Sequence, residues 1–350
     1  MLTNMKGYWW GLVLLGAGLV SCGTPEPVMR QKEVYSTLVS ITLFQNTSNS
    51  VFDKIFQRLE TIDQQMSAQR PTSQISQISA HAGISPVKVS SDTLWVLQNS
   101  LRMSQLTDGI FDPTIGPVTF LWNVEGEHPH VPSADQIAQA KALVNWHDVV
   151  INPGQKTVYL TKPGMRLDFG GIAKGYAMDE AVRIAKAAGD TVGIFNMGNS
   201  SICLLGTKPG HVPWRVGLQT PEYGAPRDSI MGIVEGYNFV VETSGPYERY
   251  FVQDGKFYHH IMDPRTGAPA QSGLMQVTLL MPADTKLGDG LSTSCFILGL
   301  DKGMKLIESM PGAQAIFVTT DHKVYLTPGA VAQFTLTNPN YHLATFTPAH

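Results

Sequence analysis

Residues 167–179 combine the residue types that can hold a phosphate. They read Leu-Asp-Phe-Gly-Gly-Ile-Ala-Lys-Gly-Tyr-Ala-Met-Asp, with Asp168, the glycine pair Gly170 and Gly171, and Lys174 placed just before a helical pattern. Glycines let main-chain amides approach a ligand closely, and a helix start leaves N–H groups unpaired, which attracts anions. Since short glycine motifs give false positives, a tight turn with a solvated lysine fits the spacing equally well.

Asp289 and Thr293 form a second pattern with chemical meaning. They are four residues apart in a segment expected to be helical, so both oxygen-bearing side chains face the same way. Together with a carbonyl oxygen of the Gly170–Gly171 turn and water, they would suit Mg²⁺, which prefers oxygen ligands. Taken alone, Asp289 is better explained as a helix cap than as a metal ligand. For the His128 and His130 pair a surface loop is a better interpretation than a metal site.

Helices and strands must position these residues. A helix is predicted from residue 177 to Gly189, because apolar residues recur there at three- and four-residue spacing. Further helices are predicted at Phe52–Met66, from Leu94 to near Gly109, and from Ser133 to Val144, the last with a capping box. Strands dominate the second half, with a hairpin at Asp254-Gly255, which favours an α+β fold of mainly antiparallel sheets with helices packed to one side.

Two further segments have weaker patterns. Val34–Phe44 is rich in β-branched residues and predicts a strand. Ser67–Val89 is polar and indicates either disorder or a loop that covers a ligand. Residues 109–117 contain many turn formers among apolar residues, which indicates a rigid, shaped loop.

Composition limits the classes of function. The 350 residues are 43% hydrophobic and 15% charged, enough for a large core. The net charge of -3 and the lack of a Lys/Arg-rich run argue against nucleic-acid binding. Cys203 and Cys295 could form one disulfide, but their apolar neighbours favour two buried thiols.

The N-terminus predicts export. Lys6 and the apolar run that follows are typical of a signal peptide over residues 1–21, and Leu19-Val20-Ser21-Cys22 resembles a bacterial lipobox. Cys22 would then be the lipidated first residue, residues 22–32 a tether, and residues 33–350 the folded domain. A plain secretory signal is the alternative. Either way the folded domain is exported. With the lipid anchor, the expected location is a bacterial membrane, facing the periplasm or the cell exterior.

Five motifs occur in one order along the chain: GIFDPTIGP at 109–117, LDFGGIAKGY at 167–176, TSGPYER at 243–249, HIMDPRTG at 260–267 and DGLST at 289–293. As a set they closely resemble the ApbE family, the FAD:protein FMN transferases, over about residues 34–330. The resemblance implies two closely packed lobes with FAD between them. It also implies Mg²⁺-dependent transfer of FMN from FAD to a threonine of an exported or membrane redox protein, with release of AMP.

The resemblance also implies roles for individual residues. The metal ligands would be Gly171, through its carbonyl, with Asp289 and Thr293. His260 and Arg249 would border the diphosphate, and His260 or a carboxylate could take the proton of the acceptor hydroxyl. The other positions that match FAD contacts are Ile110, Phe111, Asp112, Asp168, Lys174 and Ile261.

Three positions depart from the family pattern. Tyr35 stands where relatives often have the methionine of Met-Gly-Thr, and Gln69 where they often have an aromatic residue; both positions face the flavin nucleotide in relatives. Asn199 replaces a glycine and is a residue type that tolerates left-handed backbone angles. These changes leave two alternatives open: a Mg²⁺-dependent FAD pyrophosphatase that gives FMN and AMP, or a non-catalytic FAD-binding lipoprotein.

Overall fold

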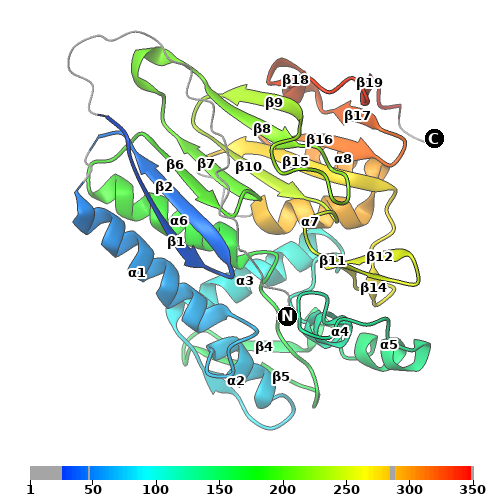
Figure 1. The fold of residues 1–350 in the computed structure, drawn as a ribbon. Coiled ribbons are helices and arrows are strands. Elements are labelled where there is room, and N and C mark those ends of the chain that lie inside the picture. Colours follow the sequence, from blue (N-terminus) through cyan, green and yellow to red (C-terminus); the bar gives the residue numbers. More distant parts are fainter. Residues whose placement is uncertain (1–25, 46–47, 284–287, 348–350) are drawn as a thin grey trace, which may run out of the picture.

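A nine-stranded sheet forms the centre of the protein (Figure 1). The computed structural model describes residues 26–347 except 46–47 and 284–287, so the expected signal peptide and Cys22 lie outside the described residues. Neighbouring strands pair antiparallel except for the last pair, which is parallel. In spatial order the strands are β1 (Val28–Val34), β2 (Thr37–Leu43), β6 (Gly193–Met197), β7 (Ser201–Leu205), β10 (Phe239–Ser244), β15 (Leu274–Pro282), β16 (Gln314–Thr319), β17 (Lys323–Leu326) and β19 (His342–Ala344).

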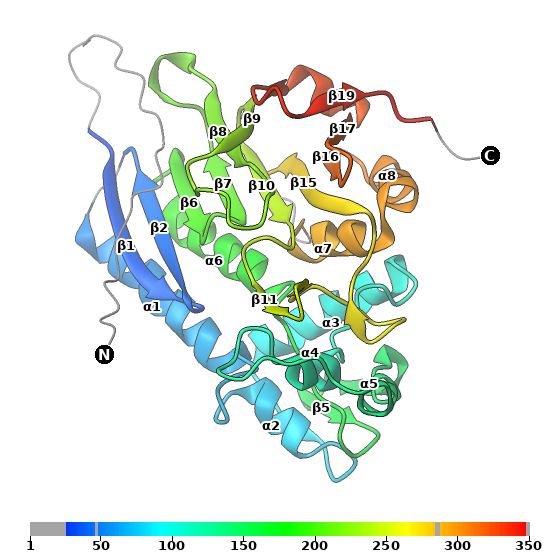
Figure 2. The same ribbon diagram turned by 45° about the vertical axis from the view of Figure 1, so that its right-hand side comes forward.

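Helices cover one face of this sheet. Figure 2 shows α6 (Ala173–Ala187) and α7 (Gly288–Leu298) side by side against it, with α1 (Asn49–Met66) beyond α6 and α8 (Leu300–Glu308) beyond α7. Their apolar side chains and the inner side chains of the strands form the largest hydrophobic cluster. Within the part of the chain that the structure describes, no helix is both long and apolar enough to cross a bilayer.

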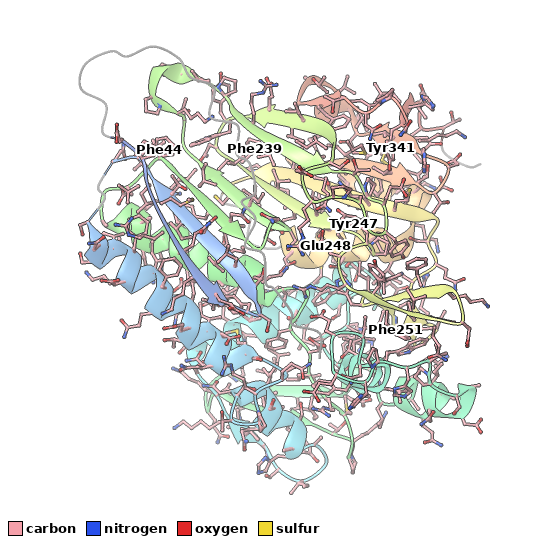
Figure 3. All side chains as sticks on the ribbon, viewed as in Figure 1. Phe44, Phe239, Tyr247, Glu248, Phe251 and Tyr341 are labelled. Carbon is pink, nitrogen blue, oxygen red and sulfur yellow. The ribbon has the colours of Figure 1, made fainter. Side chains whose placement is uncertain are left out.

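The opposite face carries a three-stranded antiparallel sheet. It consists of β8 (Trp214–Gln219), β9 (Ile230–Gly236) and β18 (Phe334–Leu336), in the order β18–β9–β8. Its apolar residues pack on outward-facing side chains of the large sheet, among them Phe44 and Phe239, which are labelled in Figure 3. The central strands of the large sheet are therefore buried on both faces.

A second region lies beside the helical face. One part holds α2 (Gln74–Ala80), α3 (Ser91–Leu106), and the small sheet of β3 (Val87–Lys88), β5 (Thr157–Leu160) and β4 (Val149–Asn152). The other part holds α4 (Gly116–Trp122), α5 (Ala134–Lys141), the hairpin of β11 (Tyr250–Gln253) and β12 (Lys256–His259), and the pair β13 (Met262–Asp263) and β14 (Ala268–Pro269). The main cluster includes residues of both α2 and the large sheet, so the first part shares the core of the sheet. Buried residues of α4, α5 and β13 form a small cluster of their own.

The α+β class with mainly antiparallel sheets is confirmed, and so are several local predictions. The Ser133–Gln136 capping box is present, although α5 ends at Lys141 rather than Val144. Asp254 and Gly255 both have positive φ at the turn between β11 and β12. Cys203 and Cys295 are free, buried thiols in separate elements.

Three predictions at the N-terminal end are wrong. The single strand expected at Val34–Phe44 is two strands, joined by a turn in which Tyr35 and Ser36 have positive φ. Strand β1 begins at Val28, so much of the expected 22–32 tether is part of the sheet; the alternation of charged residues on this exposed edge strand hides it in the sequence. Residues 67–89 are not disordered, because α2 lies there with Ile75 and Ile78 buried.

A hub of charged groups holds α6 in place. Arg58 of α1 donates to Asp92 of α3 (2.7 Å), to Glu180 of α6 (2.8 Å) and to the Tyr176 hydroxyl (3.2 Å). Tyr176 in turn donates to Asp92 (2.8 Å). Tyr176 is two residues from Lys174, so this hub fixes the first turn of α6 relative to two other helices.

We expect Arg58→Met to lower the free energy of unfolding by about 2–3 kcal/mol at pH 7, because it leaves two half-buried carboxylates without their shared partner. Hydrogen bonds from Arg58 hold the pKa of Asp92 below 3.8, and Arg183 and Arg58 hold that of Glu180 below 4.5. A lowered carboxylate pKa stabilises the fold above the ordinary value, and the stabilisation is lost as the pH falls through the folded-state value. Urea unfolding should therefore show the variant and the wild type converging below about pH 4.

The matched control is Arg183→Met. Arg183 also pairs with Glu180, but its side chain is 62% exposed, so its loss should cost less than about 1 kcal/mol. Equal losses of stability in the two variants would contradict the assignment of Arg58 as the hub.

Candidate functional site

The site forms where the first turns of α6 and α7 meet. Asp289, in the first turn of α7, accepts a hydrogen bond from the Gly175 N–H of α6 at 3.3 Å. A Cβ at Gly175 would lie 3.1 Å from the Asp289 Cβ, so a side chain here would push Asp289 away by a few tenths of an ångström and glycine is favoured. Asp289 is thus placed at the positive end of a neighbouring helix, where a carboxylate is stabilised.

The other two expected metal ligands lie at the same junction. A Cβ added at Gly290 would be 3.5 Å from the Gly171 carbonyl oxygen, and one added at Gly171 would be 3.8 Å from Thr293 Oγ1. The Phe111 ring touches both glycines, at 3.4 Å from the Gly171 position and 3.1 Å from the Gly290 position. A carbonyl, a carboxylate and a hydroxyl therefore converge beside an aromatic wall. This donor set fits Mg²⁺, which takes a few oxygen ligands and keeps part of its water shell.

Lysine and histidine side chains border this junction. Lys174 donates to Ser200 Oγ at 2.7 Å, in the turn that leads into β7. His260 Nδ1 lies 3.2 Å from the Arg249 carbonyl oxygen, which can only accept, so Nδ1 carries the proton and Nε2 keeps its lone pair. Burial, together with the nearby positive charge of Arg249, lowers the pKa of His260 to about 3. The ring is therefore neutral at pH 7.

Arg249 forms an ion pair with a residue of a second segment. Its guanidinium pairs with Glu125 at 3.0 Å, in the polar insertion at 124–132. His128 and His130 in that insertion are exposed, and no group of three or more His, Cys, Asp or Glu side chains suited to a metal occurs among the described residues. The interpretation of the His-x-His pair as a surface feature is consistent with this.

Asp168 and Asp112 have structural hydrogen bonds of their own. Asp168 accepts from the Gly170 N–H (2.8 Å) and from the Thr119 hydroxyl (2.8 Å), which fixes the glycine turn. Asp112 accepts from the Thr114 N–H and hydroxyl and from the Trp146 N–H, so its buried carboxylate holds the 109–117 loop together. Ile110 and Ile261 are buried nearby in the same hydrophobic cluster as Phe111.

Tyr35 and Gln69 lie outside the α6–α7 junction. Tyr35 lies at the tip of the β1–β2 hairpin, and its hydroxyl donates to the Leu59 carbonyl at 2.8 Å. It lines a cavity of about 360 Å³ together with Asp63 and Arg70, whose side chains form an ion pair. Gln69 is exposed in the turn before α2. The residues of the α6–α7 junction do not line this cavity.

Glu242 was not predicted as part of the site. It is only 2% exposed on β10, accepts a hydrogen bond from Ser201, and a Cβ at Gly288 would lie 3.0 Å from its Cγ. Burial and the charge of Asp289 raise the pKa of Glu242 well above its usual range. Burial also raises the pKa of Asp289, but the positive charge of Lys174 opposes that shift. We therefore assign the proton to Glu242 and the negative charge to Asp289. Glu242 is a single charged residue in a run of strand-forming residues, and such a residue carries no sequence pattern that would predict this role.

The fold and this junction define a class: an α+β protein in which a lysine, main-chain N–H groups and oxygen donors come together at two adjoining helix starts. Comparison with known proteins agrees with it. The sequence model of the ApbE family matches residues 35–317. The chain is 31% identical to the FAD:protein FMN transferase of Treponema pallidum, with 91% of this chain and 93% of the relative covered. The corresponding protein of Klebsiella pneumoniae is 33% identical, with 83% and 89% covered.

Solved structures of ApbE proteins also match this chain. The ApbE protein of Thermotoga maritima superposes with a TM-score of 0.79 at 28% identity, covering 88% of this chain and 99% of the other. The flavin transferase ApbE of Vibrio cholerae gives a TM-score of 0.78 at 28% identity with the same coverage. The chain belongs to the ApbE family.

The raised pKa of Glu242 predicts a pH effect on stability. The folded state keeps a proton that the unfolded state loses above pH 4.5, so stability should fall as the pH rises from that value, by up to about 1.4 kcal/mol per unit. Glu242→Gln removes this effect and should be more stable than the wild type at pH 8. Urea unfolding in EDTA between pH 5 and 8 measures it.

Glu235→Gln is the control for this comparison. Glu235 is a strand residue 43% exposed in a surface ion pair with Arg215, so its substitution should leave the pH dependence unchanged. A Glu242→Gln protein that is less stable than the wild type at pH 8 would show that Glu242 is ionised in the fold.

Proposed function

We propose that this chain is a Mg²⁺-dependent FAD:protein FMN transferase, which moves FMN from FAD onto a threonine hydroxyl of an acceptor protein and releases AMP. The observation that carries the proposal is the α6–α7 junction, where Lys174, Asp289, Thr293 and the Gly171 carbonyl meet. The names of the relatives from Treponema pallidum and Klebsiella pneumoniae support the same activity.

The junction supplies the electrostatics that cleavage of a diphosphate needs. Lys174 and the first turn of α6 place positive charge and N–H groups where the diphosphate oxygens would lie. Mg²⁺, held by Gly171, Asp289 and Thr293, would neutralise charge on the phosphate oxygens. Arg249, fixed by Glu125, adds positive charge near Asp289 and His260.

The transfer step then forms one bond and breaks one. The threonine oxygen of the acceptor bonds to the FMN-side phosphorus, the bond from that phosphorus to the bridging oxygen breaks, and AMP leaves with the bridging oxygen. The hydroxyl proton passes to His260 Nε2, which has a free lone pair because Nδ1 donates to the Arg249 carbonyl. A bound diphosphate brings negative charge that raises the low pKa of this ring.

Location forms part of the proposal. The lipobox-like sequence that ends at Cys22 supports an exported protein with a lipid anchor on a bacterial membrane. The acceptor would then be a redox protein that presents its threonine on the same side of that membrane.

The direct test incubates the full chain in detergent with FAD, with or without Mg²⁺ and a threonine-bearing acceptor peptide, and resolves nucleotides and peptide mass. AMP together with a peptide heavier by FMN supports the transferase. AMP with free FMN, whether or not peptide is present, indicates a pyrophosphatase, and unchanged bound FAD indicates storage.

Asp289→Ala should lower Mg²⁺-dependent AMP release by at least about 100-fold, because the charged metal ligand is lost. The control is Asp301→Ala, since Asp301 is an exposed aspartate in the first turn of the neighbouring helix α8. Full activity of the Asp289→Ala protein would remove Asp289 from the metal site.

Cys22→Ala should release the chain from the membrane fraction into the soluble exported fraction, because a lipobox cysteine is the only attachment point for the expected acyl chains. Cys203→Ala serves as the control, because Cys203 is buried in the folded domain. Continued membrane association of the Cys22→Ala protein would contradict the lipid anchor.

A further inference from the structure

A row of hydroxyl groups leads from β10 into the first turn of α7. Ser244, at the end of β10, lies 3.3 Å from Thr293 Oγ1 and 2.9 Å from Ser292 Oγ. Ser292 Oγ lies 3.0 Å from the Asp289 carbonyl oxygen. Ser244 and Ser292 are buried, so each hydroxyl depends on the others for its hydrogen bonds.

The carbonyl at the end of this row sets its direction. A carbonyl oxygen can only accept, so Ser292 donates its one proton to Asp289. Ser292 must then accept from Ser244, and Ser244, having used its own proton, must accept from Thr293. The Thr293 hydroxyl thus points its proton towards Ser244 of β10 and keeps its lone pairs for another partner. The Gly171 turn lies close to this oxygen, since a Cβ added at Gly171 would be 3.8 Å from it.

We propose that Ser244 is a positioning residue, which holds the Thr293 hydroxyl in the one orientation that lets it bind a divalent cation. A threonine oxygen whose proton faced the cation would be a poor ligand, because its hydrogen would point at the positive charge. The inference rests on the proposed function, since it assigns Ser244 to the Mg²⁺ site of that reaction. Partners that orient metal ligands typically change affinity by 10- to 100-fold when they are removed.

A second set of buried contacts keeps Ser244 in place. Tyr247, labelled in Figure 3 just after β10, donates to Gln276 at 3.1 Å, and Gln276 donates to Thr278 at 2.9 Å. Thr278 lies 3.0 Å from the hydroxyl of Thr243, the residue before Ser244. A Cβ at Gly245 would be 2.4 Å from the Tyr247 ring, so the chain after Ser244 can take only this path with a glycine.

Metal affinity tests the proposal. Titration of the full chain in detergent with Mn²⁺, following the free-ion EPR signal, should show a Ser244→Ala protein binding at least about tenfold more weakly than the wild type. The Mg²⁺ concentration for half-maximal AMP release should rise by the same factor, and saturating Mg²⁺ should restore the rate to within about threefold. Ser244→Thr keeps the hydroxyl and should restore affinity.

The matched control is Ser294→Ala. Ser294 is also buried on α7, and it donates to the Gly290 carbonyl at 2.7 Å. It is not one of the hydroxyls of the row described above. Ser294→Ala should lower the melting temperature by about as much as Ser244→Ala does, and it should leave the affinity for Mn²⁺ unchanged. Ser292→Ala should weaken Mn²⁺ binding less than Ser244→Ala, because Ser244 remains to accept from Thr293.

Each outcome decides a different point. Equal Mn²⁺ affinity of the Ser244→Ala and Ser294→Ala proteins would overturn the role of Ser244 while leaving the proposed function intact. Wild-type AMP release that needs no divalent cation would overturn the proposed function, and with it this inference. Weak Mn²⁺ binding by Ser244→Ala with recovery in Ser244→Thr would support both.

Discussion

The contact between the Asp289 carboxylate and the start of α6 is the interaction on which the site depends. A buried carboxylate is costly unless nearby groups stabilise its charge. Here the Gly175 N–H and the positive charge of Lys174 do so, and both belong to the first turn of α6. The same contact joins two residues that are 114 positions apart in sequence and fixes the distance between the two helix starts. Glycine at position 175 favours this contact, because a Cβ there would lie 3.1 Å from the Asp289 Cβ.

The surrounding fold holds the two helix starts in position. On the α6 side, Arg58 ties the helix to α1 and α3 through Tyr176 and Glu180. On the α7 side, Ser244 and Glu242 point from alternate positions of β10 towards the first turn of the helix. Since β10 is a central strand of the large sheet, buried on both faces, it gives α7 a rigid support. The two halves of the site are therefore positioned by independent structures, a charged hub and a central strand.

Much of the site could be predicted from sequence because its parts are local motifs. The glycine turn before Lys174 and the Asp289–Thr293 spacing each identify an element by type and order. The interpretation of Asp289 as a helix cap is confirmed only in part: it accepts from an N–H in the first turn of α6, and not of its own helix α7. Such long-range partners have no local signal. Glu242 was missed for the same reason, since a single acidic residue among valines carries no pattern.

The errors at the N-terminal end have a physical cause too. Strand β1 is an edge strand with exposed charged residues, which protects the sheet from pairing with other chains and also removes the apolar alternation that predicts a strand. Helix α2 is only seven residues long and buries two isoleucines in an otherwise polar segment. In both cases tertiary packing, and not local propensity, sets the structure.

In the proposed reaction, the charge balance at the junction would make the nucleotide and the cation bind together. Glu242 holds a proton, His260 is neutral, Asp289 is offset by Lys174, and Arg249 is paired with Glu125. The protein groups therefore leave little net positive charge, whereas the diphosphate of FAD carries about two negative charges at neutral pH. A divalent cation held by Asp289 and Thr293 would balance that charge, and each ligand would raise the affinity of the other by the same factor. A junction that is almost neutral when empty thus favours the dinucleotide and the cation as a pair over either one alone.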